Sequence, residues 1–172
     1  MSSIRPKYLK PGDKIMLVAP ARFVKPATIQ AAASALLAAG FTPVIPPELD
    51  ARHHQFAGSD SHRASLLNSA FRDQSIRAVF ALRGGYGSGR LLPLLDSSAY
   101  KADPTWIVGF SDITALHAWS TNLGISSLHA PVASTLTSTS PADVEAIWSN
   151  LRGEFDFNPN VKVTGGNLSV LY

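Results

Sequence analysis

The chain has 172 residues, 45% of them hydrophobic and 16% charged, which indicates one folded domain with a core and excludes a disordered chain. The net charge is +3, but Lys and Arg are scattered without a basic block, which argues against a nucleic-acid-binding protein. The absence of cysteine excludes disulfides, thiolate metal sites and a cysteine nucleophile.

The first residues lack the apolar run of a signal peptide, and no stretch approaches the ~20 apolar residues of a membrane-spanning helix. We therefore expect a cytoplasmic protein without a membrane partner.

Short apolar runs bounded by turn residues predict buried strands, and runs with helical spacing predict helices between them. The predicted strands are 14–20, 41–45, 76–82, 106–108 and 127–131, with a further candidate at 154–163. The predicted helices are 26–40, 61–74, 87–95, 113–123 and 141–151. This alternation predicts an α/β fold, a doubly wound and mostly parallel sheet with helices on both faces, as in Rossmann-like or flavodoxin-like three-layer domains.

Ligands of such sheets bind beyond the carboxyl ends of the strands. The segments that follow the predicted strands are 19–22, 83–87, 109–112 and 129–131. We expect these four segments to share one rim.

Three histidines, His53, His54 and His62, lie in or beside a polar stretch after the second strand. Adjacent histidines point apart in an extended chain, and the HExxH spacing of a zinc site is absent. The sequence therefore predicts no metal site.

Ser111 lies where the fourth strand passes into its helix, within Gly109-Phe110-Ser111-Asp112. A serine at such a corner has its hydroxyl at the edge of the sheet, beside the free N–H groups of a helix N-terminus, where an acyl-transfer nucleophile would find an oxyanion site. Serine is also an ordinary N-cap, and the G-x-S-x-G pattern is absent, so this stretch alone favours a structural cap.

The third strand runs into RGGYGSGR, residues 83–90, with four glycines in six residues. The loop matches neither G-x-G-x-x-G nor a P-loop. It is either a flexible turn or a nest of N–H groups that binds an oxyanion or a carboxylate, with Arg83 or Arg90 adding charge-assisted hydrogen bonds.

Segments 83–92 and 109–117 together resemble the signature of the serine LD-carboxypeptidases, which include murein tetrapeptide carboxypeptidases and microcin-immunity peptidases. Supporting matches are 56–60 (FAGSD), 62–63 (HR), 67–68 (LN), 129–131 (HAP, for the family's His-Gly-Pro) and 165–169 (GGNLS). The resemblance covers nearly the whole chain and makes Ser111 the nucleophile of a Ser–Glu–His triad. The other site residues it suggests are the N–H groups of Asp112 and Gly85 for the oxyanion hole, and Arg83, Gly84 and Tyr86 for substrate binding.

The activity that the resemblance implies is hydrolysis of an amide between an L-centre and a D-amino acid, releasing terminal D-alanine from murein tetrapeptide, without a metal or organic cofactor. It also implies a homodimer. Residues 1–160 would be the nucleophile-bearing N-terminal domain, and 161–172 the start of a linker to a C-terminal domain, on the same or a separate chain, that supplies the Glu and the His. Neither His117 nor His129 matches the family's base, so we expect the isolated chain to be inactive.

Two other functions stay open. The first is a microcin-type immunity peptidase that cleaves the amide of a peptidyl-nucleotide. The second is a non-catalytic module that uses the glycine loop to bind a peptide or carboxylate. An amidotransferase-like glutaminase is excluded, because the chain has no cysteine nucleophile.

Overall fold

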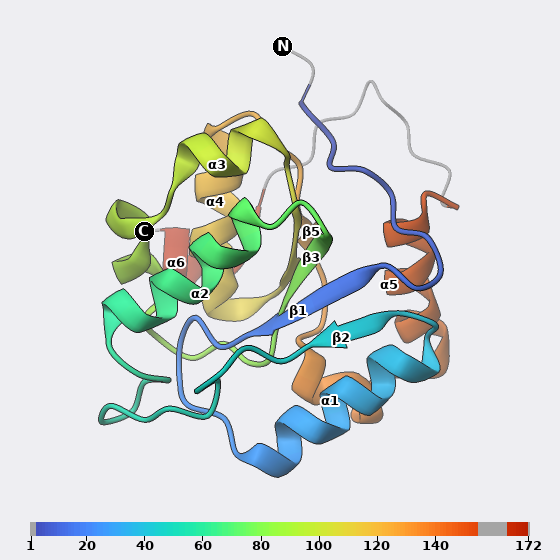
Figure 1. The fold of residues 1–172 in the computed structure, drawn as a ribbon, viewed down its shortest axis with the longest axis horizontal. Coiled ribbons are helices and arrows are strands. Elements are labelled where there is room, and N and C mark those ends of the chain that lie inside the picture. Colours follow the sequence, from blue (N-terminus) through green and yellow to red (C-terminus); the bar gives the residue numbers. More distant parts are fainter. Residues whose placement is uncertain (1–2, 155–164, 172) are drawn as a thin grey trace.

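The computed structural model describes residues 3–154 and 165–171, and its described strands form one parallel sheet (Figure 1). The strands are β1 (Lys14–Val18), β2 (Thr42–Val44), β3 (Ile76–Ala81), β4 (Trp106–Gly109) and β5 (Leu128–His129). Their order is β2-β1-β3-β4-β5, and every neighbouring pair is parallel. The predicted doubly wound α/β sheet is therefore confirmed.

Helices cover both faces of the sheet (Figure 1). The α-helices are α1 (Pro26–Ala38), α2 (Asp60–Arg72), α3 (Ser97–Ala102), α4 (Thr114–Asn122), α5 (Pro141–Arg152) and α6 (Leu168–Leu171), and the 3-10 helices are η1 (Ser88–Leu94), η2 (Ser111–Ile113) and η3 (Ala133–Ser138). Helices α1 and α5 lie against one face of the sheet, while α2, α3 and α4 lie against the other (Figure 1). No helix among the described residues is long and apolar enough to cross a membrane.

Side chains of the central strands alternate between two cores. Ile15 and Leu17 pack with α1 and α5, whereas Met16 and Val18 pack with α2 and α4. A strand that is buried on both faces is apolar along its whole length, which is why these strands appear as continuous hydrophobic runs in the sequence.

The structure contains helices that the sequence did not predict, among them α3, α6 and η3. Helix α3 is six residues long and depends on a local cap, since the Asp96 carboxylate accepts a hydrogen bond from Ala99 N at 3.0 Å. Strand β5 is two residues long, shorter than the predicted 127–131. The candidate strand 154–163 and the predicted domain boundary at 160 fall on or next to residues 155–164, outside the described part of the chain.

The last described segment, 165–171, returns to the start of α4. Asn167 N donates to Thr114 Oγ1 at 2.9 Å. A Cβ at Gly166 would lie 2.4 Å from Thr114 Cγ2, so this close approach requires glycine. The segment is thereby fixed three residues from Ser111.

Candidate active site

Ser111 lies in a strained turn between β4 and α4. Its φ angle is 62°, in the left-handed region that residues other than glycine rarely adopt. Strand β4 ends at Gly109, and η2 begins at Ser111 itself. A strained strand-to-helix turn of this kind exposes the nucleophilic serine in α/β-hydrolases.

Ser111 does not cap a helix. The N-cap residue of α4 is Ile113, which makes no side-chain capping bond. Ser111 Oγ forms no hydrogen bond with any other described residue, and the side chain is partly exposed. The N-cap explanation of Ser111 is therefore wrong, and the hydroxyl is available to a ligand.

A pocket with a volume of ≈ 470 Å³ lies at this edge of the sheet. Its walls come from the segments that follow β1, β3, β4 and β5, and Ser111 lies on one of them. Of the four predicted rim segments, 83–87 and 109–112 contribute lining residues, whereas the lining in the other two loops begins just beyond 19–22 and 129–131. The lining residues are Phe23, Val24, Lys25, Thr28, Arg83, Gly84, Gly85, Phe110, Ser111, Val132, Ser134 and Thr135.

The glycine loop touches the serine turn at Gly84. A Cβ at Gly84 would lie 3.0 Å from Ser111 Cβ, 3.1 Å from Ser111 Oγ and 3.3 Å from Asp112 N. The next residue, Gly85, has φ 126°, and its N–H donates to no described residue. The two segments that carry the predicted oxyanion donors, Asp112 and Gly85, therefore meet at Ser111.

Of the two arginines that flank the loop, only Arg83 lines the pocket. Arg90 is paired with the Asp60 carboxylate at 2.7 Å. Tyr86 is 54% exposed and packs against Phe56, with ring centroids 6.1 Å apart, and is not among the described residues that line the pocket.

The pocket is electropositive. Lys25 and Arg83 line it, and no described carboxylate lies within ion-pair distance of either. Lys25 is also the N-cap of α1, a 13-residue helix whose N-terminal N–H groups and dipole favour an anion. The described lining residues include no Asp, Glu or His, so this arrangement suits a negatively charged ligand.

His117 is buried beneath the serine turn and is not a base for Ser111. Its Nε2 donates to the Gly109 carbonyl at 2.8 Å, and its Nδ1 accepts from Ser127 Oγ at 2.8 Å. Burial lowers the pKa of His117 to about 4, and the neighbouring His129 acts in the same direction. The ring is therefore neutral near pH 7, and both of its nitrogens are occupied.

The remaining histidines form no metal site. His53 and His54 are exposed, and His62 faces Glu48, with Nε2 3.2 Å from its carbonyl. No group of three or more potential ligands gathers anywhere in the described ranges.

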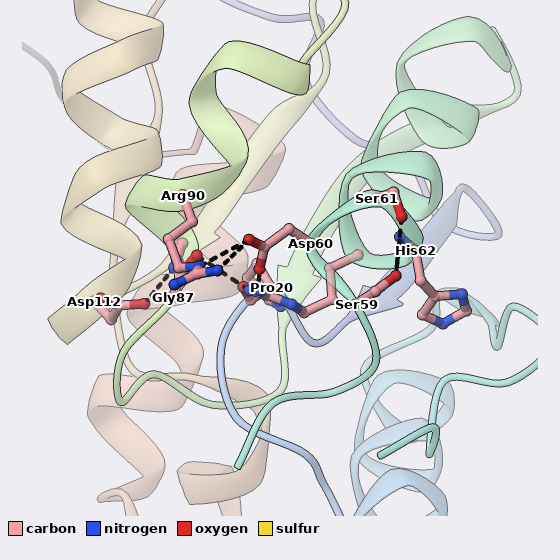
Figure 2. Close-up of polar contacts among 10 residues, drawn as sticks. Pro20, Ser59, Asp60, Ser61, His62, Gly87, Arg90 and Asp112 are labelled. Atoms are coloured by element: carbon pink, nitrogen blue, oxygen red, sulfur yellow. Dashed lines mark hydrogen bonds and ion pairs between the residues drawn. The ribbon is translucent and has the colours of Figure 1, made fainter. Parts of the chain in front are cut away.

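Sequence reasoning missed the side chains that hold the glycine loop in place. Figure 2 shows Asp60, Arg90, Gly87 and Asp112 gathered with the Pro20 carbonyl beside this loop. Arg63 belongs to the same cluster and is 2% exposed. A signal was present, because Arg63 lies four residues before Leu67 and therefore on the apolar stripe of α2.

Comparisons with known proteins identify the family of the chain. A family model described as the LD-carboxypeptidase N-terminal domain matches residues 15–130. An inferred carboxypeptidase of Streptomyces coelicolor is 43% identical over 135 residues, which are 76% of this chain and 44% of the relative. The murein tetrapeptide carboxypeptidase of Pseudomonas aeruginosa is 36% identical over 124 residues, covering 72% of this chain and 40% of that protein.

The crystal structure of an MccF-like protein from Bacillus anthracis superposes with a TM-score of 0.80 at 28% identity, over 87% of this chain and 47% of that one. The chain thus spans less than half the length of each of these three relatives. The family model matches residues of all five strands and of the serine turn. The chain therefore belongs to the LD-carboxypeptidase family and corresponds to the N-terminal domain of that family.

Proposed function

We infer that the chain is the nucleophile-bearing part of a serine peptidase that hydrolyses an LD-amide bond and releases terminal D-alanine from murein tetrapeptide. The observation that carries this inference is Ser111, held at φ 62° with a free hydroxyl on the wall of the pocket. The Pseudomonas aeruginosa relative, a murein tetrapeptide carboxypeptidase by name, supports the substrate class.

In the proposed reaction Ser111 Oγ attacks the carbonyl carbon of the scissile amide. Its proton passes to a base outside the described residues, which then protonates the departing amine of D-alanine. The N–H groups of Asp112 and Gly85 stabilise the negative charge on the carbonyl oxygen. Water then hydrolyses the acyl-enzyme and restores the hydroxyl of Ser111.

A carboxypeptidase must recognise the terminal carboxylate of its substrate. We assign this role to Arg83, assisted by Lys25 and the N-terminus of α1, because these groups bring positive charge to the pocket that Ser111 lines. Gly84 would let the substrate carbonyl approach closely. Tyr86, exposed beside the loop, would contact the part of the peptide that extends beyond the pocket.

The proposal includes no metal or organic cofactor. A Glu and a His from a C-terminal domain would complete the triad, so the 172-residue chain alone is expected to be inactive. A cytoplasmic location and a homodimer belong to the same proposal, and cell fractionation and light scattering would test them.

A serine-directed fluorophosphonate probe tests the nucleophile. The chain would be fused at its C-terminus to the C-terminal half of the Streptomyces coelicolor relative and incubated with probe or with murein tetrapeptide. We expect labelling of Ser111 and release of D-alanine, both lost in Ser111→Ala. Ser134→Ala is the matched control, because Ser134 lines the same pocket without the strained turn. Labelling that persists in Ser111→Ala would remove Ser111 from the reaction.

The same fusion separates the alternatives. The MccF-like structural relative keeps the immunity peptidase in consideration, and cleavage of a peptidyl-nucleotide amide in preference to murein tetrapeptide would establish it. Peptide binding without labelling or hydrolysis would instead indicate a non-catalytic module.

A further inference from the structure

A cluster of charged side chains, with its exposed edge at Arg90 and its buried part at Arg63 and Asp112, lies beside the glycine loop and contributes nothing to the described pocket lining. Its members are Arg63 and three residues labelled in Figure 2, Asp60, Arg90 and Asp112. The mechanism proposed above uses only the backbone N–H of Asp112, so the side chains of the cluster need another explanation.

Arg63 is the centre of the cluster, and its side chain is 0% exposed. Its Nη1 donates to the Gly87 carbonyl at 3.1 Å and also to the Pro20 carbonyl. Its Nη2 pairs with Asp60, whose other carboxylate oxygen accepts from Arg90 Nε at 2.8 Å. One guanidinium therefore joins helix α2 to the loops that follow β1 and β3.

Arg63 and Asp112 hold opposite ends of the same peptide unit. The Gly87 carbonyl accepts from Arg63, and the N–H of Ser88, the other end of that peptide bond, donates to Asp112 Oδ2 at 2.8 Å. A cation thus binds the negative end of the peptide dipole, and a carboxylate binds its positive end. Charge-assisted hydrogen bonds are about twice as strong as neutral ones, so this pair fixes the orientation of the Gly87–Ser88 peptide.

This peptide connects the glycine loop to the nucleophile. Asp112 follows Ser111 directly, so its carboxylate ties Ser88 to the serine turn, while Gly84 contacts Ser111 itself. The loop is therefore anchored to that turn on both sides of Gly85, the proposed oxyanion donor. A Cβ at Gly87 would lie 2.9 Å from Arg63 Nη1, so glycine is needed for the guanidinium to reach the carbonyl.

Stability alone does not explain a buried arginine here. Arg63 Nε has no acceptor among the described residues, and burial lowers the pKa of the Arg63 guanidinium. A buried charge with an unsatisfied donor is costly, and replacing buried ion pairs by apolar side chains is often neutral or stabilising. Arg63 must therefore contribute something that an apolar side chain would not.

We propose that Arg63 is a positioning residue, which acts through the Gly87–Ser88 peptide and Asp112 to set the register of the glycine loop against Ser111. Its effect on the rate of amide hydrolysis rests on the proposed function.

The first arm of the test is structural and uses the 172-residue chain without any substrate. The variants are Arg63→Met, which removes the charge, and Arg63→Lys, which keeps the charge but cannot bind both carbonyls and Asp60 in the same way. Arg72→Lys is the matched control, because Arg72 lies in the last turn of α2 and pairs with Asp96 with its side chain 62% exposed.

Nuclear magnetic resonance reports the register directly. In both Arg63 variants we expect amide exchange at Ser88 to be at least about tenfold faster while the β3 amides keep their protection. We also expect a weaker Overhauser contact between Gly84 Hα and Ser111 Hβ. Arg72→Lys should change neither signal, and if Arg63→Met fails to fold, Arg63→Lys decides.

The second arm measures kinetics on the fusion protein. A misplaced oxyanion loop weakens binding of the transition state and not of the ground state, so kcat should fall about 100-fold in Arg63→Lys. KM should stay within about twofold of its original value. A purely structural role would instead lower the amount of folded enzyme and leave kcat per folded molecule unchanged.

The two arms separate the two proposals. Unchanged Ser88 exchange and an unchanged Gly84–Ser111 contact would overturn the role of Arg63, whatever the activity. A shifted loop with unchanged kcat would overturn it as well. If the unmodified fusion hydrolyses no LD-amide, the proposed function fails, and the structural arm still decides whether Arg63 sets the register.

Discussion

At the scale of single residues, the backbone conformation of Ser111 has the clearest energetic consequence. A side chain at φ 62° costs about 1 kcal/mol relative to glycine, because its Cβ crowds the following carbonyl oxygen. Nothing in the packing of the described chain requires a serine hydroxyl there, since it makes no hydrogen bond within that part. The strain is therefore consistent with a residue retained for its reactivity.

Relief of this strain can be measured. We expect the free energy of unfolding in urea to be about 1 kcal/mol higher for Ser111→Gly than for Ser111→Ala, because only glycine accepts this φ without strain. Ser111→Gly is then the more stable variant. The same pair of changes at Ser134, in η3 at an ordinary φ, should give the reverse order. Equal stability of the two Ser111 variants would contradict a strained turn.

At the scale of elements, the glycine loop and the serine turn lie in direct contact at Gly84. Gly84 has no positive φ, so its lack of a side chain matters for space alone. A methyl group there would push against Ser111 Cβ and Oγ at 3.0 and 3.1 Å. At Gly89, in η1, the nearest atom to an added Cβ is 3.9 Å away, which is an ordinary contact.

These two glycines form a matched pair for mutation. We expect Gly84→Ala to lower the rate of fluorophosphonate labelling of the fusion protein on the order of 100-fold, because small displacements of reacting groups are costly. Gly89→Ala should label at the original rate, and both variants should keep their melting temperatures. Full reactivity in Gly84→Ala would show that the loop does not need to touch the serine turn.

The elements that the sequence predicted best are those whose stability is local or periodic. The run KIMLV of β1 and the alanine-rich α1 carry their signals in adjacent residues. Helix α3 and η3 are both short. Helix α3 depends on the Asp96 cap, and η3, which has no side-chain cap, depends on packing against α1, and a periodicity of 3.6 residues reveals neither.

The candidate site was predictable in a similarly uneven way. The serine turn and the glycine loop are contiguous motifs, so they could be identified from the chain. Arg63 binds the Gly87 carbonyl and Asp112 binds the Ser88 N–H, and each pair is 24 positions apart in the sequence. No local pattern therefore encodes these contacts.

At the scale of the whole molecule, His117 links stability to pH. Its ring joins α4 to the Gly109 carbonyl at the end of β4 and to Ser127 just before β5. Its pKa in the folded chain is about 4, below the ordinary value of 6.5. Between these values the unfolded chain binds a proton that the folded chain does not, so folding is weakened as the pH falls.

The free energy of unfolding should therefore be highest above pH 6.5 and decline down to about pH 4, with His117 contributing on the order of 3 kcal/mol of the loss. His117→Gln should lower stability at pH 7 and flatten this decline. His53→Gln, on an exposed loop, should keep the slope of the original chain. The free energy of unfolding is measured in urea at each pH. If its decline with falling pH is as steep in His117→Gln as in the original chain, His117 is not the cause of that decline.

The distribution of the pocket lining along the chain has a consequence for biosynthesis. The centre of the sheet, β1 and β3, has been synthesised once Ala81 is added, but the lining extends from Phe23 to Thr135. A nascent polypeptide emerging from the ribosome can therefore pair its central strands long before it can enclose a substrate. The pocket can form only after Thr135 has been added, when the earlier loops already have paired strands to pack against.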